Sequence, residues 1–359
     1  MEIKFGFTNL VLQPTSLCNL DCTYCYLPNR DKNLRMGVEV TQAIAKNIAS
    51  FPKMRITWHG GEPLACGLDH FEKLIKPFIS LEEEGKVKHS IQTNATLIND
   101  DWCQFFLKHQ FVVGVSIDGP QYLNRNRIDW NGKESYLRVI KGIECLKRNG
   151  LDFPIIAVVS DESLDKAKEM YRFFCDIGCK SLGINVEEKE CVNIHRDICD
   201  DTKVKMFWAE LFNEWKINPV IDIREITKAL VWMNIISKQG VPITSYYRDI
   251  FPTVGYNGDV VLLSPELLGG KHPVYHNFVV GNILKESLED IIIKGKETWY
   301  VTDFIEGVKK CEEECSYFSL CQGGYASNKY YENGSMNTTE TVSCRNMEQR
   351  LLEGFMGVL

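Results

Sequence analysis

Three cysteines near the start of the chain are spaced to bind metal: Cys18, Cys22 and Cys25. They form a C-x3-C-x2-C run shortly after the apolar stretch 10–12, so one short loop carries all three thiols. Thiolates in this arrangement can hold three irons of a [4Fe-4S] cluster, which usually takes four protein sulfurs. No fourth ligand stands beside the loop, so one iron would stay open to bind another molecule.

Zinc and disulfide bonds are the alternatives for these cysteines. A structural zinc site needs four ligands, usually as two pairs, and the nearest histidine, His59, is distant in sequence. Disulfides require an oxidising compartment, but the N-terminus lacks the pattern of a signal peptide. The 14 cysteines of the chain therefore indicate metal binding rather than a disulfide framework.

A second set of cysteines follows late in the chain. Cys311, Cys315 and Cys321 form C-x3-C-x5-C, and Cys344 stands further on. Four thiolates would saturate a cluster and leave no open iron. The spacing alone is equally compatible with a four-cysteine zinc site.

The composition of the 359-residue chain is that of an ordinary globular protein, with 44% hydrophobic and 25% charged residues. A net charge of -7 gives no basic surface for nucleic acid or anionic lipid. No apolar run approaches the length of a membrane span. We therefore expect a cytoplasmic protein without nucleic-acid or membrane partners.

The elements that must position the first cysteine set alternate between strand and helix over about 215 residues. Strand patterns occupy 9–13, 55–58, 89–93, 112–117, 155–159 and 181–186. Helical patterns occupy 40–50, 71–81, 101–109, 136–148, 164–177 and 203–215. Such alternation predicts an α/β fold with a parallel sheet, and six units predict a partial (β/α)6 TIM-like barrel rather than a closed one of eight.

The later part of the chain has a different character, with frequent Gly, Asn and Pro turns and shorter helical patterns. We predict a core over 1–218, a bridging helix within 219–240, an auxiliary domain over 241–345 and a C-terminal helical tail over 346–359. The strongest pattern in the bridge spans 225–237.

Polar motifs follow the predicted strands at their carboxyl ends, where barrels of this kind build their sites. Gly60-Gly61-Glu62-Pro63 follows the second strand, Asn94 follows the third, and Ser116 lies at the end of the fourth. Two glycines allow a ligand close to the backbone, and a carboxylate can accept hydrogen bonds from an ammonium group.

Together, the cysteine loop and these motifs resemble the radical S-adenosylmethionine (SAM) superfamily. The resemblance implies that SAM chelates the open iron and that electron transfer cleaves it to methionine and a 5'-deoxyadenosyl radical. It implies SAM contacts from Tyr24, Gly60, Gly61, Glu62, Pro63, Asn94, Ser116 and Arg127. In this scheme the GGEP segment binds the amino group and Arg127 pairs with the carboxylate. The family's His-Asp pair before this arginine is absent from 123–127.

The C-terminal region is similar to the SPASM domain of peptide-modifying radical SAM enzymes, on the basis of 280–283 and the late cysteine run. A full SPASM domain holds two auxiliary clusters. Here the early ligands of the inner cluster are missing from 241–266, and Tyr325 stands at its last ligand position. The resemblance therefore implies one auxiliary [4Fe-4S] cluster, held by the four late cysteines, and two clusters in all.

The segments 321–341 and 263–267 resemble cyclophane-forming maturases and GrrM-type enzymes. This resemblance implies a precursor-peptide substrate, an oxidative carbon–carbon crosslink to an aromatic residue, and a reductant such as flavodoxin or ferredoxin. Alternatives are a formylglycine-generating enzyme like the sulfatase maturases, a radical SAM enzyme acting on a free amino acid or metabolite, and an iron–sulfur regulator without catalysis.

Several further residues are assigned structural roles. Cys66, Cys103 and Cys145 are expected in the core, and 82–84 is expected to be a solvated helix end. Cys175 and Cys179 are four residues apart and could share a helix face, while Cys191, His195 and Cys199 lack a fourth metal ligand.

Overall fold

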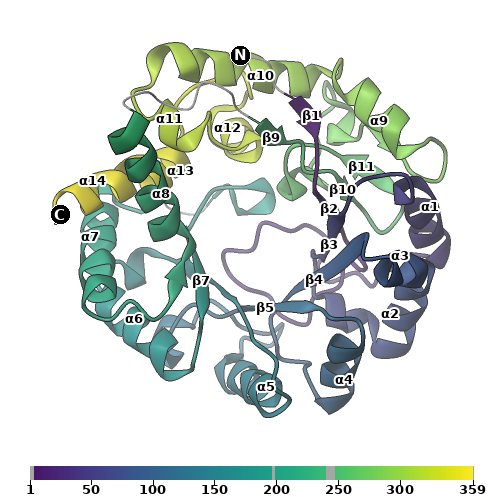
Figure 1. The fold of residues 1–359 in the computed structure, drawn as a ribbon, viewed down its shortest axis with the longest axis horizontal. Coiled ribbons are helices and arrows are strands. Elements are labelled where there is room, and N and C mark those ends of the chain that lie inside the picture. The colour runs from purple at the N-terminus through teal and green to yellow at the C-terminus, as the bar shows by residue number, and fades with distance from the viewer. Residues whose placement is uncertain (1–3, 196–198, 240–246, 359) are drawn as a thin grey trace.

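The computed structural model describes residues 4–195, 199–239 and 247–358 (Figure 1). Strands gather around the middle of the molecule in this view, and most helices lie outside them. One ten-stranded sheet has the order β12-β11-β10-β2-β3-β4-β5-β6-β7-β8. Neighbours from β10 to β8 in this order run parallel, which confirms the predicted α/β fold.

The parallel part of the sheet contains the six predicted strands and two more. The predicted strands are β2 (Asn9–Leu12), β3 (Met54–Trp58), β4 (Val87–Thr93), β5 (Val112–Ser116), β6 (Ile155–Val159) and β7 (Ser181–Val186). β8 (Asp222–Ile223) adds to β7, and β10 (Thr253–Val254) adds to β2. Each of these extra strands has two residues, too few for a period-two pattern to be recognised.

Helices connect the parallel strands. They are α1 (Val38–Ile48), α2 (Leu68–Ile75), α3 (Ile79–Glu83), α4 (Asp100–Lys108), α5 (Tyr136–Arg148), α6 (Ala167–Asp176) and α7 (Asp201–Ile217). The helix predicted over 71–81 is divided by a 3-10 turn, Lys76–Phe78. Pro77 lies in that turn, where its missing N–H and fixed backbone angle interrupt an α-helix.

The C-terminal region is built onto the same sheet. β11 (Asp259–Val261) and β12 (Gly281–Asn282) extend it antiparallel beyond β10, and Thr253 pairs with Val11 of the barrel. β9 (Tyr247–Asp249) pairs separately with β1 (Lys4–Gly6). The helices here are α8 (Arg224–Gln239), which covers the predicted bridge, α9 (Leu288–Gly295), α10 (Trp299–Glu314), α11 (Phe318–Cys321), α12 (Ala326–Asn333), α13 (Val342–Cys344) and α14 (Arg350–Met356).

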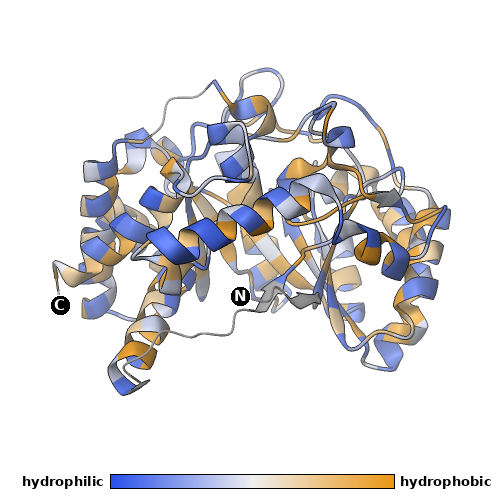
Figure 2. Cartoon of the chain, turned by 90° about the horizontal axis from the view of Figure 1, so that it is seen from above, coloured by the Kyte–Doolittle hydropathy of each residue, from blue (hydrophilic) through white to orange (hydrophobic). Residues whose placement is uncertain are grey.

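The hydrophobic core fills the space between the sheet and its helices. Figure 2 shows hydrophobic colours on the strands and on one side of many helices, with hydrophilic residues on the outer surface. Buried aromatic side chains are dense beside β3, where Trp58 contacts Phe71 and Phe78. No described helix has the length and apolar character needed to cross a bilayer.

The prediction of a solvated helix end at 82–84 holds for Glu83 and Glu84, which are exposed, and fails for Glu82. Glu82 is not simply part of a solvated helix end, because its carboxylate accepts hydrogen bonds from His89 Nε2 at 3.1 Å and His109 Nδ1 at 2.9 Å. His89 is buried and accepts from Trp58 Nε1 at 3.1 Å. These partners are distant in sequence, so the charge run at 82–84 does not reveal them.

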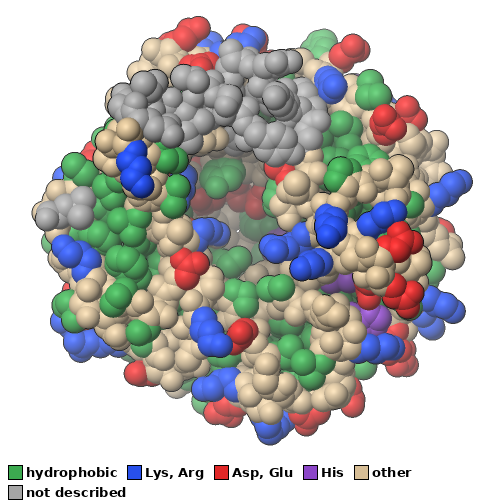
Figure 3. All heavy atoms as spheres, in the orientation of Figure 1, with side chains coloured by type: hydrophobic (Ala, Val, Ile, Leu, Met, Phe, Trp, Pro, Cys, Tyr) green, Lys and Arg blue, Asp and Glu red, His purple; other side chains and the backbone are tan. Residues whose placement is uncertain are grey.

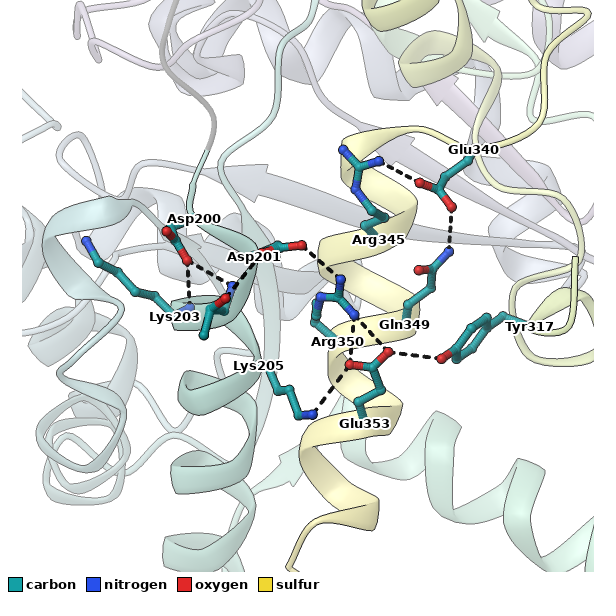
Figure 4. Close-up of polar contacts among 11 residues, drawn as sticks. Asp200, Asp201, Lys203, Lys205, Tyr317, Glu340, Arg345, Gln349, Arg350 and Glu353 are labelled. Carbon is teal, nitrogen blue, oxygen red and sulfur yellow. Dashed lines mark hydrogen bonds and ion pairs between the residues drawn. The ribbon is translucent and has the colours of Figure 1, made fainter.

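The C-terminal tail packs against the barrel along α7. Phe355 of α14 stacks on Phe212 of α7 with ring centroids 4.4 Å apart. At the surface, Arg350 links Glu353 of its own helix to Asp201 at the start of α7 (Figure 4). The helical run that contains Cys344 is thereby anchored to the barrel.

Candidate active site

The first three cysteines lie on the loop between β2 and α1, at the carboxyl end of the strand. The loop folds back on itself, because Cys18 N–H donates to Arg30 O at 2.9 Å. It also pairs with the segment before α5, where Thr23 N–H donates to Asn126 O and Trp130 Nε1 donates to Cys18 O. These hydrogen bonds fix the cysteine loop from both sides.

The three thiols are free and half-buried. Burial raises the pKa of Cys18 and raises that of Cys22 to about 12, although Arg127 and Arg30 oppose the shift at Cys22. Without metal, the thiols of Cys18 and Cys22 are therefore protonated at neutral pH, and metal binding must release their protons.

The Gly60–Gly61 turn packs directly against the cysteine loop. Gly61 has φ +63°, and a Cβ there would lie 2.6 Å from the carbonyl oxygens of Thr15 and Leu17. Glu62 N–H donates to Leu17 O at 2.8 Å. Only glycine at position 61 permits this close approach, so the turn and the loop form one structural unit.

The Glu62 side chain crosslinks the ends of two strands. Its Oε1 accepts from Leu64 N–H at 3.1 Å and Thr93 Oγ1 at 2.7 Å, and its Oε2 accepts from Asn94 N–H at 2.8 Å. Burial raises the pKa of this carboxyl, while the three hydrogen bonds oppose the rise. In the structure, Glu62 thus holds the carboxyl end of β4 against the turn after β3.

Asn94 and Ser116 stand at the carboxyl ends of neighbouring strands, as predicted. Asn94 Nδ2 donates to Asn19 Oδ1 at 2.9 Å and lies 3.9 Å from Cys18 Sγ. Ser116 Oγ accepts from Gln92 Nε2 at 2.8 Å. Asn94 therefore adjoins the cysteine loop directly.

Arg127 joins a buried group beneath the cysteine loop. Its Nε lies 3.1 Å from Asp118 Oδ1, and its guanidinium lies over the Tyr24 ring at 5.6 Å. Tyr24 OH donates to Asp118 Oδ2 at 2.6 Å. The Nε–H is not aimed at the carboxylate, so the contact is an ion pair without a well-formed hydrogen bond. Sequence analysis missed Asp118 as the partner, although Asp118 immediately follows the fourth strand pattern.

A further group near Cys25 was also missed. Tyr26 OH lies 3.0 Å from His59 Nε2, and both residues are half-buried. Burial lowers the pKa of His59 to about 4, which keeps its imidazole neutral. Burial raises the pKa of Tyr26, and Glu266 and Glu190 add to the rise. Figure 3 shows a hollow in the middle of this face, with hydrophobic, acidic and basic side chains around it.

Acidic residues after β7 connect the barrel mouth to the C-terminal region. Glu188 accepts from Asn328 Nδ2 at 3.0 Å and from Ser343 Oγ at 2.9 Å. Asn328 belongs to α12 and Ser343 to α13. Burial raises the pKa of Glu188 and also that of Glu190, whose shift is increased by Glu266 and Glu188.

The four late cysteines line one cavity of about 260 Å³. Cys311 lies near the end of α10, Cys315 follows this helix, Cys321 ends α11 and Cys344 ends α13. All four are free thiols. The structure thus brings together the set that the sequence grouped, although Cys311 and Cys344 are separated by 32 intervening positions.

A lysine stands in the same cavity and was not predicted. Lys329 of α12 is 1% exposed, and its Nζ donates to Cys311 Sγ at 3.3 Å. Burial lowers its pKa, whereas the thiols of Cys311, Cys344 and Cys321, when ionised, raise it. A buried ammonium group needs negative partners, and metal-bound thiolates would supply them. The four thiols around one cavity therefore fit a metal cluster, whose thiolate ligands stand further apart than those of a single ion.

The cysteines assigned to the core are buried as expected. Cys103 Sγ lies 3.6 Å from Cys145 Sγ, and Cys66 is also enclosed. His195 is exposed, and Cys179 follows the end of α6. Among the described residues, no three or more His, Cys, Asp and Glu side chains are grouped to hold a single metal ion.

Comparison with known proteins identifies the family. A family model described as the radical SAM superfamily matches residues 12–174, which include the first cysteines, the Gly60–Gly61 turn and Arg127. An uncharacterized protein of Synechocystis sp. is 34% identical over 99% of this chain and 93% of its own. This chain belongs to the radical SAM superfamily. It is therefore an enzyme that uses SAM and iron–sulfur chemistry.

Characterised relatives and solved structures agree with this assignment. The serine-type anaerobic sulfatase-maturating enzyme of Bacteroides thetaiotaomicron is 27% identical over 88% of this chain and 81% of its own. The structure of anSMEcpe with bound AdoMet matches with a TM-score of 0.78 and 23% identity, covering 97% of each chain. Streptococcus suis SuiB bound to precursor peptide SuiA matches with a TM-score of 0.71 and 18% identity, covering 95% of this chain and 76% of SuiB.

Proposed function

We propose that this radical SAM enzyme modifies a ribosomal precursor peptide by forming an oxidative carbon–carbon crosslink at an aromatic residue. The separation of two cysteine sets, one on the β2 loop and one in the C-terminal cavity, carries the proposal. In it, Cys18, Cys22 and Cys25 hold the [4Fe-4S] cluster that binds SAM. Cys311, Cys315, Cys321 and Cys344 hold an auxiliary [4Fe-4S] cluster.

The residues around the first loop would position SAM. We assign its amino group to the Gly60–Gly61 segment, and its ribose and carboxylate to the region of Asn94, Ser116 and Arg127. Glu62 and Asp118 fix these groups through the contacts described above. When bound, the reduced cluster and SAM supply a 5'-deoxyadenosyl radical that removes a hydrogen atom from the substrate.

The crosslink removes two hydrogen atoms from the peptide in total. One is transferred to the adenosyl group, and the other leaves as a proton and an electron after the carbon–carbon bond forms. The electron would need an acceptor, and an auxiliary cluster held by the four late cysteines would supply one, because potentials of such clusters span a wide range. The first cluster needs a reductant such as flavodoxin or ferredoxin.

The peptide is proposed on two grounds. SuiB, which shares the fold, was solved with a precursor peptide, and the segments 321–341 and 263–267 resemble crosslinking maturases. The full-length similarity to sulfatase-maturating enzymes favours formylglycine formation as the second candidate. The vacant inner-cluster positions, including Tyr325, count against that candidate.

Anaerobic turnover of a precursor peptide encoded beside the enzyme tests the proposal, with SAM and a reductant present. The crosslinked product should be about 2 Da lighter and should fragment as a ring that includes an aromatic residue. Oxidation of serine to formylglycine also removes two hydrogens, so mass alone does not separate the candidates. Reaction with a hydroxylamine probe would reveal the aldehyde and contradict the crosslink. Turnover of a free amino acid alone would contradict a peptide substrate.

A further inference from the structure

The buried lysine in the C-terminal cavity has an unusual set of partners. Besides Cys311 Sγ, Lys329 Nζ donates to Gly307 O at 3.4 Å, to Thr339 O at 3.1 Å and to Thr338 O. An ammonium group has three protons, so these four acceptors occupy all its donor capacity. No ion pair joins Lys329 to a carboxylate of the described residues.

The carboxylates that share this cavity do not neutralise the lysine. Glu340 pairs with Arg345 and accepts from Gln349 Nε2 at 3.2 Å. Glu314 also lines the cavity, but among the described residues it is not one of the groups that Lys329 Nζ contacts. The sulfurs of the cavity, with Cys311 Sγ at 3.3 Å, are therefore the groups able to carry the compensating negative charge.

We propose that Lys329 is a positioning residue that raises the reduction potential of the auxiliary cluster held by Cys311, Cys315, Cys321 and Cys344. Reduction adds an electron to a group that is already negative because of its thiolates. A cation fixed 3.3 Å from a ligand sulfur, in a site shielded from water, stabilises the reduced state more than the oxidised one. Hydrogen bonds to cluster sulfurs act in the same direction.

Lys329 lies on a helix that contacts both the barrel and the auxiliary site. α12 also carries Asn328, which contacts Glu188 at the barrel mouth, so consecutive residues face the barrel and the auxiliary site. A higher reduction potential favours transfer of an electron from the crosslinked substrate radical to the cluster. The cluster would be reduced in this step, and the peptide would be oxidised and would lose a proton. The inference rests on the proposed oxidative function and assigns a residue to its electron-accepting step.

A clamp role is the competing explanation. Lys329 binds carbonyls of the 338–339 segment, which packs closely on Gly307, where a Cβ would lie 2.8 Å from Thr338 O. A purely structural lysine would affect folding and leave the potential of an intact cluster unchanged. The reduction potential therefore separates the two roles.

The test uses full-length protein with Cys18, Cys22 and Cys25 replaced by alanine, so that only the auxiliary cluster contributes to the signal. EPR-monitored redox titration compares Lys329→Met with Lys310→Met. Lys310 adjoins Cys311 in sequence but is exposed, so the control removes the same charge where water screens it.

At a fixed solution potential, we expect the reduced-to-oxidised ratio in Lys329→Met to fall about tenfold, equivalent to about 59 mV for a one-electron couple. Lys310→Met should leave the ratio unchanged. Equal ratios in both variants would overturn the inference. Lys329→Gln, which keeps a donor without the charge, should give an intermediate ratio.

A second measurement keeps Lys329 and does not depend on folding of its variants. Pulsed EPR of the reduced auxiliary cluster in protein labelled with 15N-lysine should show a nitrogen coupling, and its absence would overturn the inference. An unaltered cluster potential in Lys329→Met would refute only the role of Lys329 and would leave the proposed function standing. Zinc in the cavity would refute both this role and the proposed electron acceptor. A shifted potential without a crosslinked peptide would refute the proposed function alone.

Discussion

At the scale of single residues, the two cysteine sets should respond differently to substitution. Cys22→Ala should abolish production of 5'-deoxyadenosine from SAM, because it removes a proposed ligand of the SAM-binding cluster. Cys315→Ala should retain SAM cleavage and lose crosslinked product. Chromatography of 5'-deoxyadenosine, alongside peptide mass spectrometry, measures both outcomes.

Cys175→Ala is the matched control, since Cys175 is a half-buried free thiol on α6 and should support normal turnover. Full product yield from folded Cys315→Ala protein would contradict an electron-accepting role for the second set. SAM cleavage by Cys22→Ala at the rate of the unaltered enzyme would contradict the assignment of the first set.

Glu62 provides a second prediction at this scale. In the native protein, Asn94 N–H donates to a carboxylate oxygen of Glu62 at 2.8 Å. In Glu62→Gln, the NH2 group of the side-chain amide would face this N–H, so two donors would meet and the N–H would lose its acceptor. Leaving a buried donor without an acceptor costs about 1–3 kcal/mol, so the urea midpoint of the reconstituted enzyme should fall, together with SAM cleavage. Glu84→Gln is the control, because Glu84 is exposed and its pair with Lys86 contributes little. Identical midpoints for both variants would refute the crosslinking role of Glu62.

Residue types and spacing predicted the cysteine sets and the strand-end motifs, because sequence-local patterns define them. The partners of those residues could not be predicted in the same way. Tyr26 meets His59, and Lys329 meets Cys311, through packing of separate elements. A buried lysine has no sequence signature that distinguishes it from an exposed one.

At the scale of elements, the contact between α3 and β4 makes stability depend on pH. His89 Nδ1 accepts from Trp58 Nε1, so its proton lies on Nε2, which donates to Glu82. Burial lowers the pKa of His89, although Glu82 opposes the shift. The folded state therefore favours the neutral imidazole, while the unfolded chain takes up a proton below about pH 6.5.

The sign follows from proton binding. As pH falls below about 6.5, the unfolded state binds more protons, so the unfolding free energy should decrease by up to about 1.4 kcal/mol per pH unit from this group. Glu82 acts at lower pH. Burial would raise its pKa, but the hydrogen bonds from His89 and His109 outweigh burial and lower it, so its contribution is lost as pH falls from about 4.5 through the folded pKa.

Urea midpoints between pH 5 and pH 7.5 measure the histidine contribution. His89→Gln should flatten the decline, because glutamine does not titrate. His70→Gln is the control: His70 is half-buried and contacts Met36 O, and its replacement should leave the slope as it is. Equal slopes for both variants would show that His89 is not the group responsible.

Elements with strong periodicity were predicted to within a few residues, as β6 over 155–159 and α5 over 136–148 show. The failures have local causes. Pro77 divides the helix predicted over 71–81, and β8 and β10 are too short for their alternation to be read. Their pairing is set by neighbouring strands rather than by their own composition.

At the scale of the whole molecule, the sequence indicated two regions of different character, and the structure shows one sheet passing through both. Thr253 of β10 pairs with Val11 of β2. β2 is the strand that leads to the first cysteines. Glu188 joins the barrel mouth to α12 and α13. The position of each proposed cluster is thus fixed by contacts between regions that are far apart in sequence, which single-sequence patterns do not encode.

The packing of α14 on α7 should therefore control the auxiliary site. A Cβ at Gly354 would lie 2.8 Å from Lys205 O, 3.0 Å from Ala209 N and 3.1 Å from Trp208 Cβ. Gly354→Leu should cost about 1–3 kcal/mol through overpacking and displace the helical run that holds Cys344. Anaerobic iron analysis should then fall from about eight irons per chain to about four, with SAM cleavage retained.

Gly357→Leu is the matched control for this prediction. A Cβ at Gly357 would meet only its own helix, at 3.4 Å from Glu353 O, so both clusters should assemble and the iron content should stay at about eight. Full iron content in Gly354→Leu would show that docking of α14 does not hold Cys344 in place. Loss of all iron would show instead that the barrel depends on the tail for folding, because α14 packs on α7 and carries none of the first three cysteines.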